Sequence, residues 1–284
     1  MYNKVIFYCE FGNGDVFESR EFVKALMKLI SAKECLYSHK RSSRILYDIT
    51  NIKSIDFNPD FKSNLTFINL PNNELAINMW IGNGKYGCLV ENHYDMHNET
   101  LKKLGFDKLP GNPKDYLPVI EYSKFDIGGV GLFESVSKGW DGMILIDNGD
   151  VHSLQAKNFD FTPTIQRLST EHPNKLFITT SPTTYQDPNI WYTGDIIQSI
   201  YDSDLMEISY LSRFCDIIAG RNSAPFVVSA TKENLDTDKT FISFCYEEKV
   251  ATFHVNQKVK SKQIWSGVVD EVGVFNVINH EIQE

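Results

Sequence analysis

The chain has 284 residues, with 28 Lys and Arg against 37 Asp and Glu, and its net charge is −9. Hydrophobic residues make up 42% and aromatic residues 13%, a globular balance that excludes a disordered, collagen-like or coiled-coil chain. The acidic charge argues against a protein that binds nucleic acid or an anionic membrane, because both ligands need a basic surface. No apolar run reaches the roughly 18 residues of a membrane-spanning helix. The N-terminus also lacks the pattern of a signal peptide.

The five cysteines are odd in number and widely spaced, and no pair has the CxxC spacing. This usage indicates neither a disulfide framework nor a zinc knuckle. We therefore expect a protein of the reducing cytoplasm.

Strand and helix patterns alternate through the first part of the chain. An apolar run over 5–11 predicts a buried strand, a glycine-rich turn follows at 12–15, and the spacing of apolar residues predicts an amphipathic helix from about Glu18 to Ala32. Further strands are predicted at 34–39, 65–70 and 76–82, and a helix over 93–104 that closes at Gly105. A strand, a glycine-rich turn and an amphipathic helix are typical of the start of a Rossmann-like domain.

The pattern restarts after a segment dense in proline and glycine, which indicates a domain boundary. A strand is predicted at 142–147, a helix beginning with Thr162 and Pro163, and a helix over 205–215 capped by Asp204. The other predicted strands are 175–181, 189–194, 215–220 and 239–245. We therefore predict an α/β protein with two Rossmann-like domains, 1–125 and 141–284, joined by a linker over 126–140.

Ligands of open α/β sheets bind beyond the carboxyl ends of the strands, and the first candidate site lies in the turn after the first strand. Gly12, Asn13 and Gly14 let the backbone approach a ligand closely, and Asp15 follows them. A carboxylate at this place can act as a general base on a hydroxyl group. It can also simply cap the following helix.

A second candidate site is the turn Gly220, Arg221, Asn222, Ser223 and Ala224, between a strand and a predicted helix. Arg221 suits a bidentate contact with phosphate, and the neighbouring polar groups can donate hydrogen bonds. The alternative is an ordinary turn in which Arg221 forms a surface ion pair.

A third candidate site combines the ends of two strands in the second domain. Its residues are Asn148, Gly149, Ser153 and Lys157 in one loop, and Thr180 and Ser181 in another. Loops at such positions often hold phosphate, although Ser and Thr are also common at strand ends without a ligand.

The remaining motifs are interpreted as structural. His93 and His97 have the spacing of two metal ligands on one helix face, but no third ligand is evident, so we expect surface histidines. Asp202, Ser203 and Asp204 have the spelling of a metal-binding DxD triplet, but they precede a predicted helix and are interpreted as its cap. No metal site is predicted.

Three segments together resemble the GT-B glycosyltransferases, particularly the bacterial lipopolysaccharide heptosyltransferases. They are Gly14-Asp15-Val16 after the first strand, the sequence LKKLGF at 101–106, and the sequence LSRFCDIIAGRNSAPF at 211–226. The family commonly has Asp in the last of these turns and His after it, where this chain has Arg221, Asn222 and Phe226.

The resemblance implies a compact GT-B-like protein whose two domains face a cleft, with an acceptor site in the first domain and a nucleotide-sugar site in the second. Asp15 is then the base that deprotonates an acceptor hydroxyl on a glycan or glycoconjugate, and the second and third candidate sites hold the donor diphosphate. The implied transfer is inverting and metal-independent, and needs no cofactor. Two alternatives are a non-catalytic binder of nucleotides or sugars, and a sugar-nucleotide epimerase built from two similar halves.

Overall fold

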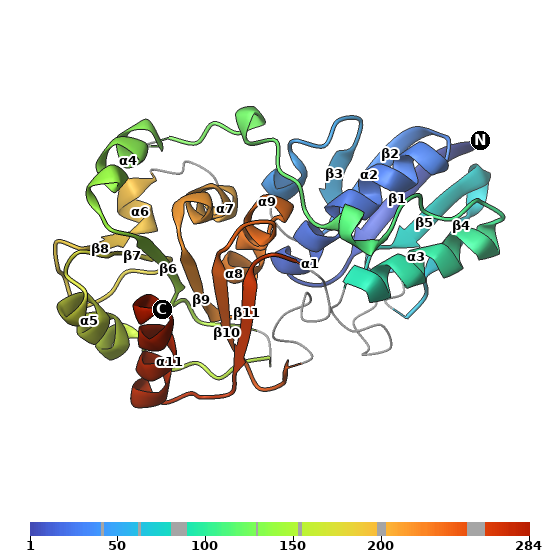
Figure 1. Cartoon of the computed structure of the whole chain (residues 1–284). Coiled ribbons are helices and arrows are strands. Elements are labelled where there is room, and N and C mark those ends of the chain that lie inside the picture. Colours follow the sequence, from blue (N-terminus) through green and yellow to red (C-terminus); the bar gives the residue numbers. More distant parts are fainter. Residues whose placement is uncertain are drawn as a thin grey trace. The chain divides into compact units, whose positions relative to one another are not determined.

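The computed structural model describes residues 1–40, 43–61, 64–80, 90–128, 130–152, 155–197, 203–248 and 259–284. The chain forms two compact units, Met1–Phe125 and Asp126–Glu284 (Figure 1). Each unit has its own sheet and its own helices. None of the helices within the described ranges is long and apolar enough to cross a membrane.

The first unit contains a five-stranded sheet of order β3-β2-β1-β5-β4. Its strands are β1 (Tyr2–Cys9), β2 (Ala32–His39), β3 (Lys53–Asp56), β4 (Phe67–Leu70) and β5 (Glu74–Asn78). Strand β4 is antiparallel to β5, and the other pairs are parallel. The predicted strand at the start of the chain is the central one, which explains why its last five residues are all buried.

The helices of the first unit are α1 (Asn13–Glu18), α2 (Arg20–Leu29) and α3 (Val90–Leu104). Short 3₁₀ turns are η1 (Ser43–Leu46), η2 (Pro71–Asn73), η3 (Pro113–Tyr116) and η4 (Tyr122–Lys124). The predicted helix from Glu18 is therefore α2, preceded by a short helix that the sequence did not indicate. Gly105 ends α3 with a φ of +78°, as its predicted cap requires.

A buried ion pair ties α2 to the end of the first unit. Arg20 is completely buried, and its Nη2 lies 2.6 Å from both carboxylate oxygens of Asp48. The backbone N–H of Glu121 donates to the same carboxylate at 3.0 Å. Burial by itself raises the pKa of Asp48, but Arg20, together with the backbone N–H of Glu121 and the charge of Lys24, holds the pKa below its ordinary value. The pair therefore anchors the segment that leads out of this unit.

The second unit contains a six-stranded parallel sheet of order β11-β10-β9-β6-β7-β8. Its strands are β6 (Met143–Asp147), β7 (Leu176–Thr179), β8 (Ile190–Tyr192), β9 (Ile217–Arg221), β10 (Thr240–Phe244) and β11 (Lys262–Ser266). Its helices are α4 (Val130–Val136), α5 (Thr162–Glu171), α6 (Thr193–Ile196), α7 (Leu205–Leu211), α8 (Ala224–Ser229), α9 (Lys232–Leu235) and α11 (Glu271–Gln283), with 3₁₀ turns η5 (Ser137–Gly139) and η6 (Ser212–Phe214). Helices α5 and α11 pack together on β6, β9 and β10 through a buried apolar cluster.

The segment 126–140, predicted as the linker between the domains, contains the helix α4 and the 3₁₀ turn η5. Phe133 of α4 is 1% exposed and packs against Phe214 and Trp191, with ring centroids 5.6 Å and 6.3 Å away. Burial of this aromatic ring stabilises a helix in spite of the neighbouring glycines.

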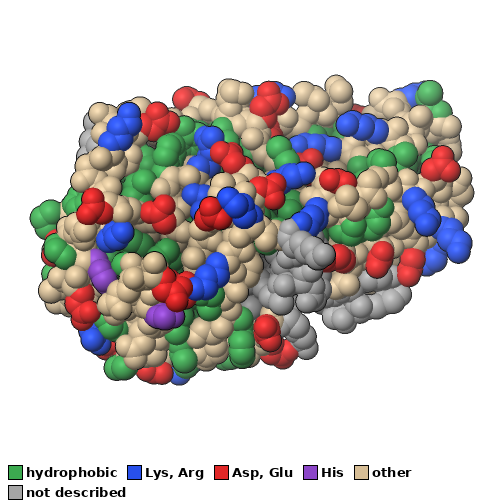
Figure 2. Space-filling view, viewed as in Figure 1, with side chains coloured by type: hydrophobic (Ala, Val, Ile, Leu, Met, Phe, Trp, Pro, Cys, Tyr) green, Lys and Arg blue, Asp and Glu red, His purple; other side chains and the backbone are tan. Residues whose placement is uncertain are grey.

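Acidic and basic side chains lie interspersed over the face of the molecule shown in Figure 2. This face of the molecule shows no large patch of a single charge, which agrees with the modest excess of acidic residues in the sequence.

Candidate functional site

The turn after β1 places Asp15 at the carboxyl end of the central strand of the first unit. Gly12 is the N-cap of α1 with an extended backbone, and Asp15 is its third helical residue. The Oδ2 atom of Asp15 accepts a hydrogen bond from the backbone N–H of Gly12 at 2.7 Å. Asp15 therefore caps the start of α1 rather than the helix from Glu18 for which its cap was predicted. Its position is also where parallel α/β sheets present catalytic groups.

Glu18 is a second carboxyl group on the same short helix, one turn after Asp15. Burial, reinforced by the nearby charge of Asp15, raises the pKa of Glu18 well above its ordinary value. Sequence reasoning missed Glu18. The signal was its spacing of three residues from Asp15, which puts both on one face of a helix.

In the second unit, Asp147 joins three neighbouring strand ends. It is the last residue of β6 and is 1% exposed. Thr180, just after β7, donates from its Oγ1 to Asp147 Oδ1 at 3.0 Å. Ser223, just after β9, donates from its Oγ to Asp147 Oδ2 in a short contact. Because β7 and β9 flank β6, these residues bring the second and third predicted sites together.

Burial raises the pKa of Asp147 to about 6, even though the Ser223 and Thr180 hydroxyls and the charge of Arg221 favour its ionised form. Sequence reasoning did not select Asp147. The signal available was a carboxylate at the end of an otherwise apolar strand, where burial of a charge is costly.

The guanidinium of Arg221 is turned to the backbone of a neighbouring loop, an environment that the sequence did not predict. The side chain is completely buried, and its N–H groups donate to backbone oxygens of the loop 148–159. Those oxygens belong to Asn148 at 3.2 Å, Gly149 at 2.6 Å, Lys157 at 3.2 Å and Phe159. The guanidinium also lies 4.6 Å from the ring centroid of Phe159. Arg221 therefore organises this loop, and the alternative of a surface ion pair is wrong because the side chain is buried.

The loops after β6 and β7 are joined by a pair of hydrogen bonds. The side-chain amide of Asn148 donates to Ser181 O at 3.0 Å and accepts from Ser181 N at 2.8 Å. Beside this pair lies an open cavity of about 570 Å³. Its lining residues are Asn148, Gly149, Asp150, Asn158, Phe159, Asp160, Phe161, Thr162, Ser181 and Pro182.

Only some of the other residues predicted for the donor site lie against Asp147 or Arg221. Gly220 lies on β9 against Asp147, and Ala224 begins α8. The backbone oxygen of Lys157 accepts a hydrogen bond from Arg221, although Lys157 is otherwise exposed. Asn222 is 7% exposed. Ser153 lies outside the described residues.

His93 and His97 are not surface histidines, which corrects their interpretation. They are 5% and 0% exposed, and His97 packs against Phe22 with ring centroids 4.9 Å apart. Among the residues that the structure describes, neither ring nitrogen of His97 has a hydrogen-bond partner. Burial, followed by the effect of His93, lowers the pKa of His97 to about 3. The reason is that α3 turns this face toward the core rather than toward solvent.

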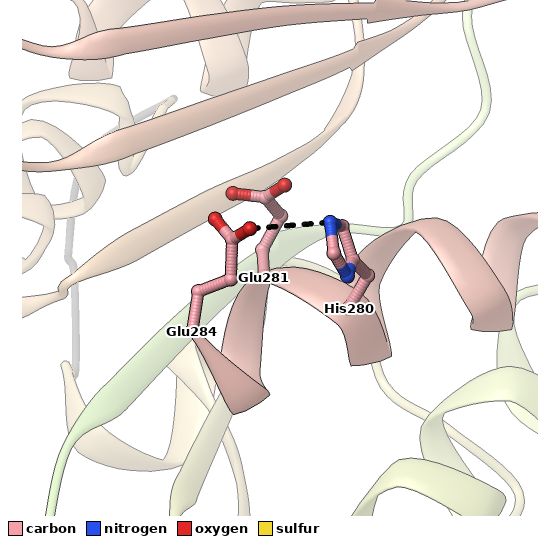
Figure 3. Close-up of side chains that lie close together, drawn as sticks. All are labelled: His280, Glu281 and Glu284. Carbon is pink, nitrogen blue, oxygen red and sulfur yellow. Dashed lines mark ion pairs between the residues drawn. The ribbon is translucent and has the colours of Figure 1, made fainter.

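A cluster of His280, Glu281 and Glu284 near the end of α11 has the composition of a metal site (Figure 3). The Nζ atom of Lys262 lies 2.8 Å from Glu281 and 2.6 Å from Glu284. Its ammonium already supplies the positive charge that these carboxylates attract. Lys262 begins β11, so the cluster lies at the sheet edge opposite the carboxyl ends of the strands.

No protein-family model matches the chain, and no curated protein sequence matches it. Solved structures do. A family 9 glycosyl transferase from Veillonella parvula has a TM-score of 0.54 at 9% identity, with 98% of this chain and 91% of that chain covered.

Two structures from E. coli are similar to the same degree. The ADP-heptose lipopolysaccharide heptosyltransferase II has a TM-score of 0.52 at 11% identity, with 100% of this chain and 99% of that chain covered. Heptosyltransferase WaaC with ADP has a TM-score of 0.52 at 6% identity, with 98% and 99% covered. At these identities the likeness concerns the fold. It confirms the predicted fold class: an α/β chain with two Rossmann-like domains, resembling the GT-B glycosyltransferases.

Proposed function

We propose that this protein is a glycosyltransferase that moves a sugar from a nucleotide-activated donor to a hydroxyl group of a glycan or glycoconjugate. The observation that carries the proposal is the position of Asp15, at the carboxyl end of β1 and in the first turn of α1. A carboxylate there suits a general base, in a chain whose fold is that of glycosyltransferases of family 9.

The proposed reaction is a direct displacement. Asp15 takes the proton of the acceptor hydroxyl, the hydroxyl oxygen bonds to the anomeric carbon, and the bond from that carbon to the diphosphate breaks. The electron pair of the broken bond leaves with the diphosphate. A base that acts on the face of the sugar opposite the leaving group would invert the anomeric configuration, and we propose an inverting transfer.

The proposed donor site is the carboxyl edge of the second sheet, where Thr180, Ser181 and Ser223 are half-buried. Arg221 acts there as a positioning residue, because its guanidinium holds the loop 148–159. Hydroxyl and backbone N–H groups of these turns then stabilise the departing diphosphate in the place of a metal ion.

A non-catalytic nucleotide or sugar binder is the second candidate. The observation that favours it is the burial of Arg221, which leaves the predicted phosphate contact without its cation. A site that holds its ligand without stabilising the charge of a leaving diphosphate binds but does not turn over.

The two candidates are separated by incubating the protein with UDP-, GDP- and ADP-sugars and a panel of hydroxyl acceptors, and measuring nucleotide release. The transferase proposal expects acceptor-dependent release that a chelator does not abolish. Tight binding of a nucleotide sugar without release under any acceptor would overturn it in favour of the binder.

A further inference from the structure

Ser223 occupies the N-cap of α8, yet its side chain makes no capping hydrogen bond. A serine at this place ordinarily accepts a hydrogen bond from the first turn of the helix. Here its hydroxyl is turned to the carboxylate of Asp147 instead, and Thr180 is turned to the same carboxylate from the other side. Asp147 itself is buried, whereas Ser223 and Thr180 are half-buried.

The direction of these hydrogen bonds depends on the proton of Asp147. An ionised carboxylate can only accept, so both hydroxyls must point their hydrogens at Asp147 and present only lone pairs outward. A protonated Asp147 donates one hydrogen bond itself. One of the two hydroxyls then has its hydrogen available for an external acceptor.

We propose that Asp147 is a positioning residue that decides whether Ser223 and Thr180 can donate hydrogen bonds to the diphosphate of the donor. The oxygens of a sugar-linked diphosphate are acceptors, so they need donors from the protein. Asp147 does not touch the ligand and acts through the two hydroxyls. This inference rests on the function proposed above and assigns a residue to its donor site.

The surroundings of Asp147 place this change within ordinary pH. Arg221 on β9 and the backbone N–H of Gly149 favour the ionised form of Asp147. Thr180, just after β7, contributes an uncharged hydroxyl. Burial opposes ionisation more strongly than these groups favour it. The positive charge of Arg221 also interacts electrostatically with the carboxylates of Asp150 and Asp160. The balance is a pKa of about 6, so Asp147 is mainly protonated at pH 5.5 and mainly ionised at pH 7.5.

The test is calorimetric titration of UDP-, GDP- and ADP-sugars at pH 5.5 and 7.5. Sugar-linked diphosphates are used because a terminal phosphate itself titrates near pH 6. If only the protonated form binds, the affinity of the wild-type protein rises by at most about 25-fold at the lower pH, the ratio of the protonated fractions for a pKa of about 6.

Asp147→Asn is expected to bind with an affinity that is the same at both pH values and close to that of the wild type at pH 5.5. Its amide can donate to Ser223 and accept from Thr180, so the hydroxyl of Ser223 keeps its hydrogen. The matched control is Asp216→Asn. Asp216 accepts from Met143 N at 3.0 Å, at the amino end of β6, and this variant should keep the wild-type pH dependence.

Equal wild-type affinity at the two pH values, or an unchanged pH dependence in Asp147→Asn, would overturn the inference and leave the proposed function standing. Absence of any binding by the wild type at both pH values would overturn the proposed function and the inference with it. Circular dichroism checks that Asp147→Asn is folded. If it is not, the double variant Ser223→Ala and Thr180→Val, which removes both hydroxyls, takes its place: loss of most of the gain at pH 5.5 supports the inference, and an unchanged gain overturns it.

Discussion

The side chain of Asp147 lies against the backbone of Gly220 on the neighbouring strand. A Cβ atom added to Gly220 would lie 2.5 Å from Asp147 Cβ and 2.8 Å from its backbone oxygen. Both contacts are shorter than any ordinary non-bonded approach. Strands β6 and β9 can therefore approach this closely at Asp147 and Gly220 because residue 220 has no side chain.

We expect Gly220→Ala to destabilise the second unit by roughly 1–3 kcal/mol, since strand β9 or β6 must shift to relieve the overlap. Urea unfolding followed by circular dichroism measures the change. Gly139→Ala is the control, because no atom of the described part of the chain lies within 4 Å of an added Cβ there. Equal stability of the two variants would show that the strands tolerate the overlap.

Arg221→Lys is expected to destabilise the second unit by about 3 kcal/mol and to loosen the loop 148–159. A lysine has three donors without a planar fork, so several buried backbone oxygens lose their partner. Hydrogen exchange of the loop and urea unfolding measure the effect. Arg167→Lys serves as control, because Arg167 is about half exposed and pairs with Glu171 at the surface. A loop that stays protected in Arg221→Lys would contradict the anchoring role.

His97 makes the first unit sensitive to acid. Folded His97 has a pKa of about 3 and unfolded histidine a pKa of about 6.5, so between these values the unfolded chain binds more protons. Stability therefore falls as the pH falls below 6.5, by about 3 kcal/mol at pH 4.5.

The variant His97→Leu is expected to remove most of this slope, as measured by denaturant unfolding at a series of pH values with hydrogen exchange to follow the first unit. His152→Gln is the control, because His152 is exposed. An unchanged slope in His97→Leu would assign the acid sensitivity to other groups.

Asp15→Asn is expected to lower kcat of the proposed transfer by about 10²- to 10⁴-fold with little change in donor affinity, the usual range for loss of a general base. The amide oxygen can still accept from Gly12 N, so the cap of α1 is kept. Nucleotide-release kinetics and donor titration measure both quantities.

The matched control for Asp15 is Asp115→Asn. Asp115 accepts from the backbone N–H of Asn112 at 3.0 Å and caps η3 in the same way, away from the turn after β1. Full activity in Asp15→Asn would refute the assignment of the base and favour the epimerase alternative.

Much of the fold was predictable because its signals are local. The buried strands β1, β6, β7, β9 and β10 were each predicted within a few residues, since a parallel strand covered on both faces is a continuous apolar run. The strands β3 and β11 and the helix α11 were missed. Strand β3 has a largely exposed burial pattern, and β11 alternates weakly, so neither has the apolar run that marks a core strand.

The candidate site was predicted only in part. Gly12, Asp15, Thr180 and Ser223 were selected because they follow strands, and the structure places them there. The backbone contacts of Arg221 were not predicted, because a cation at a strand end is equally able to bind phosphate or backbone oxygens. Glu18 and Asp147 were missed because burial is what raises their pKa values, and the sequence near them does not reveal burial.

The sequence by itself determined the α/β class and the positions of the strand ends where polar residues gather, because apolar periodicity and turn residues act over a few neighbours in the chain. Only the tertiary structure decided which of those residues are joined by hydrogen bonds and which line the same cavity. The hydrogen bonds of Asp147 and Arg221 join residues 33 to 76 positions apart, and their energies depend on burial created by the whole sheet.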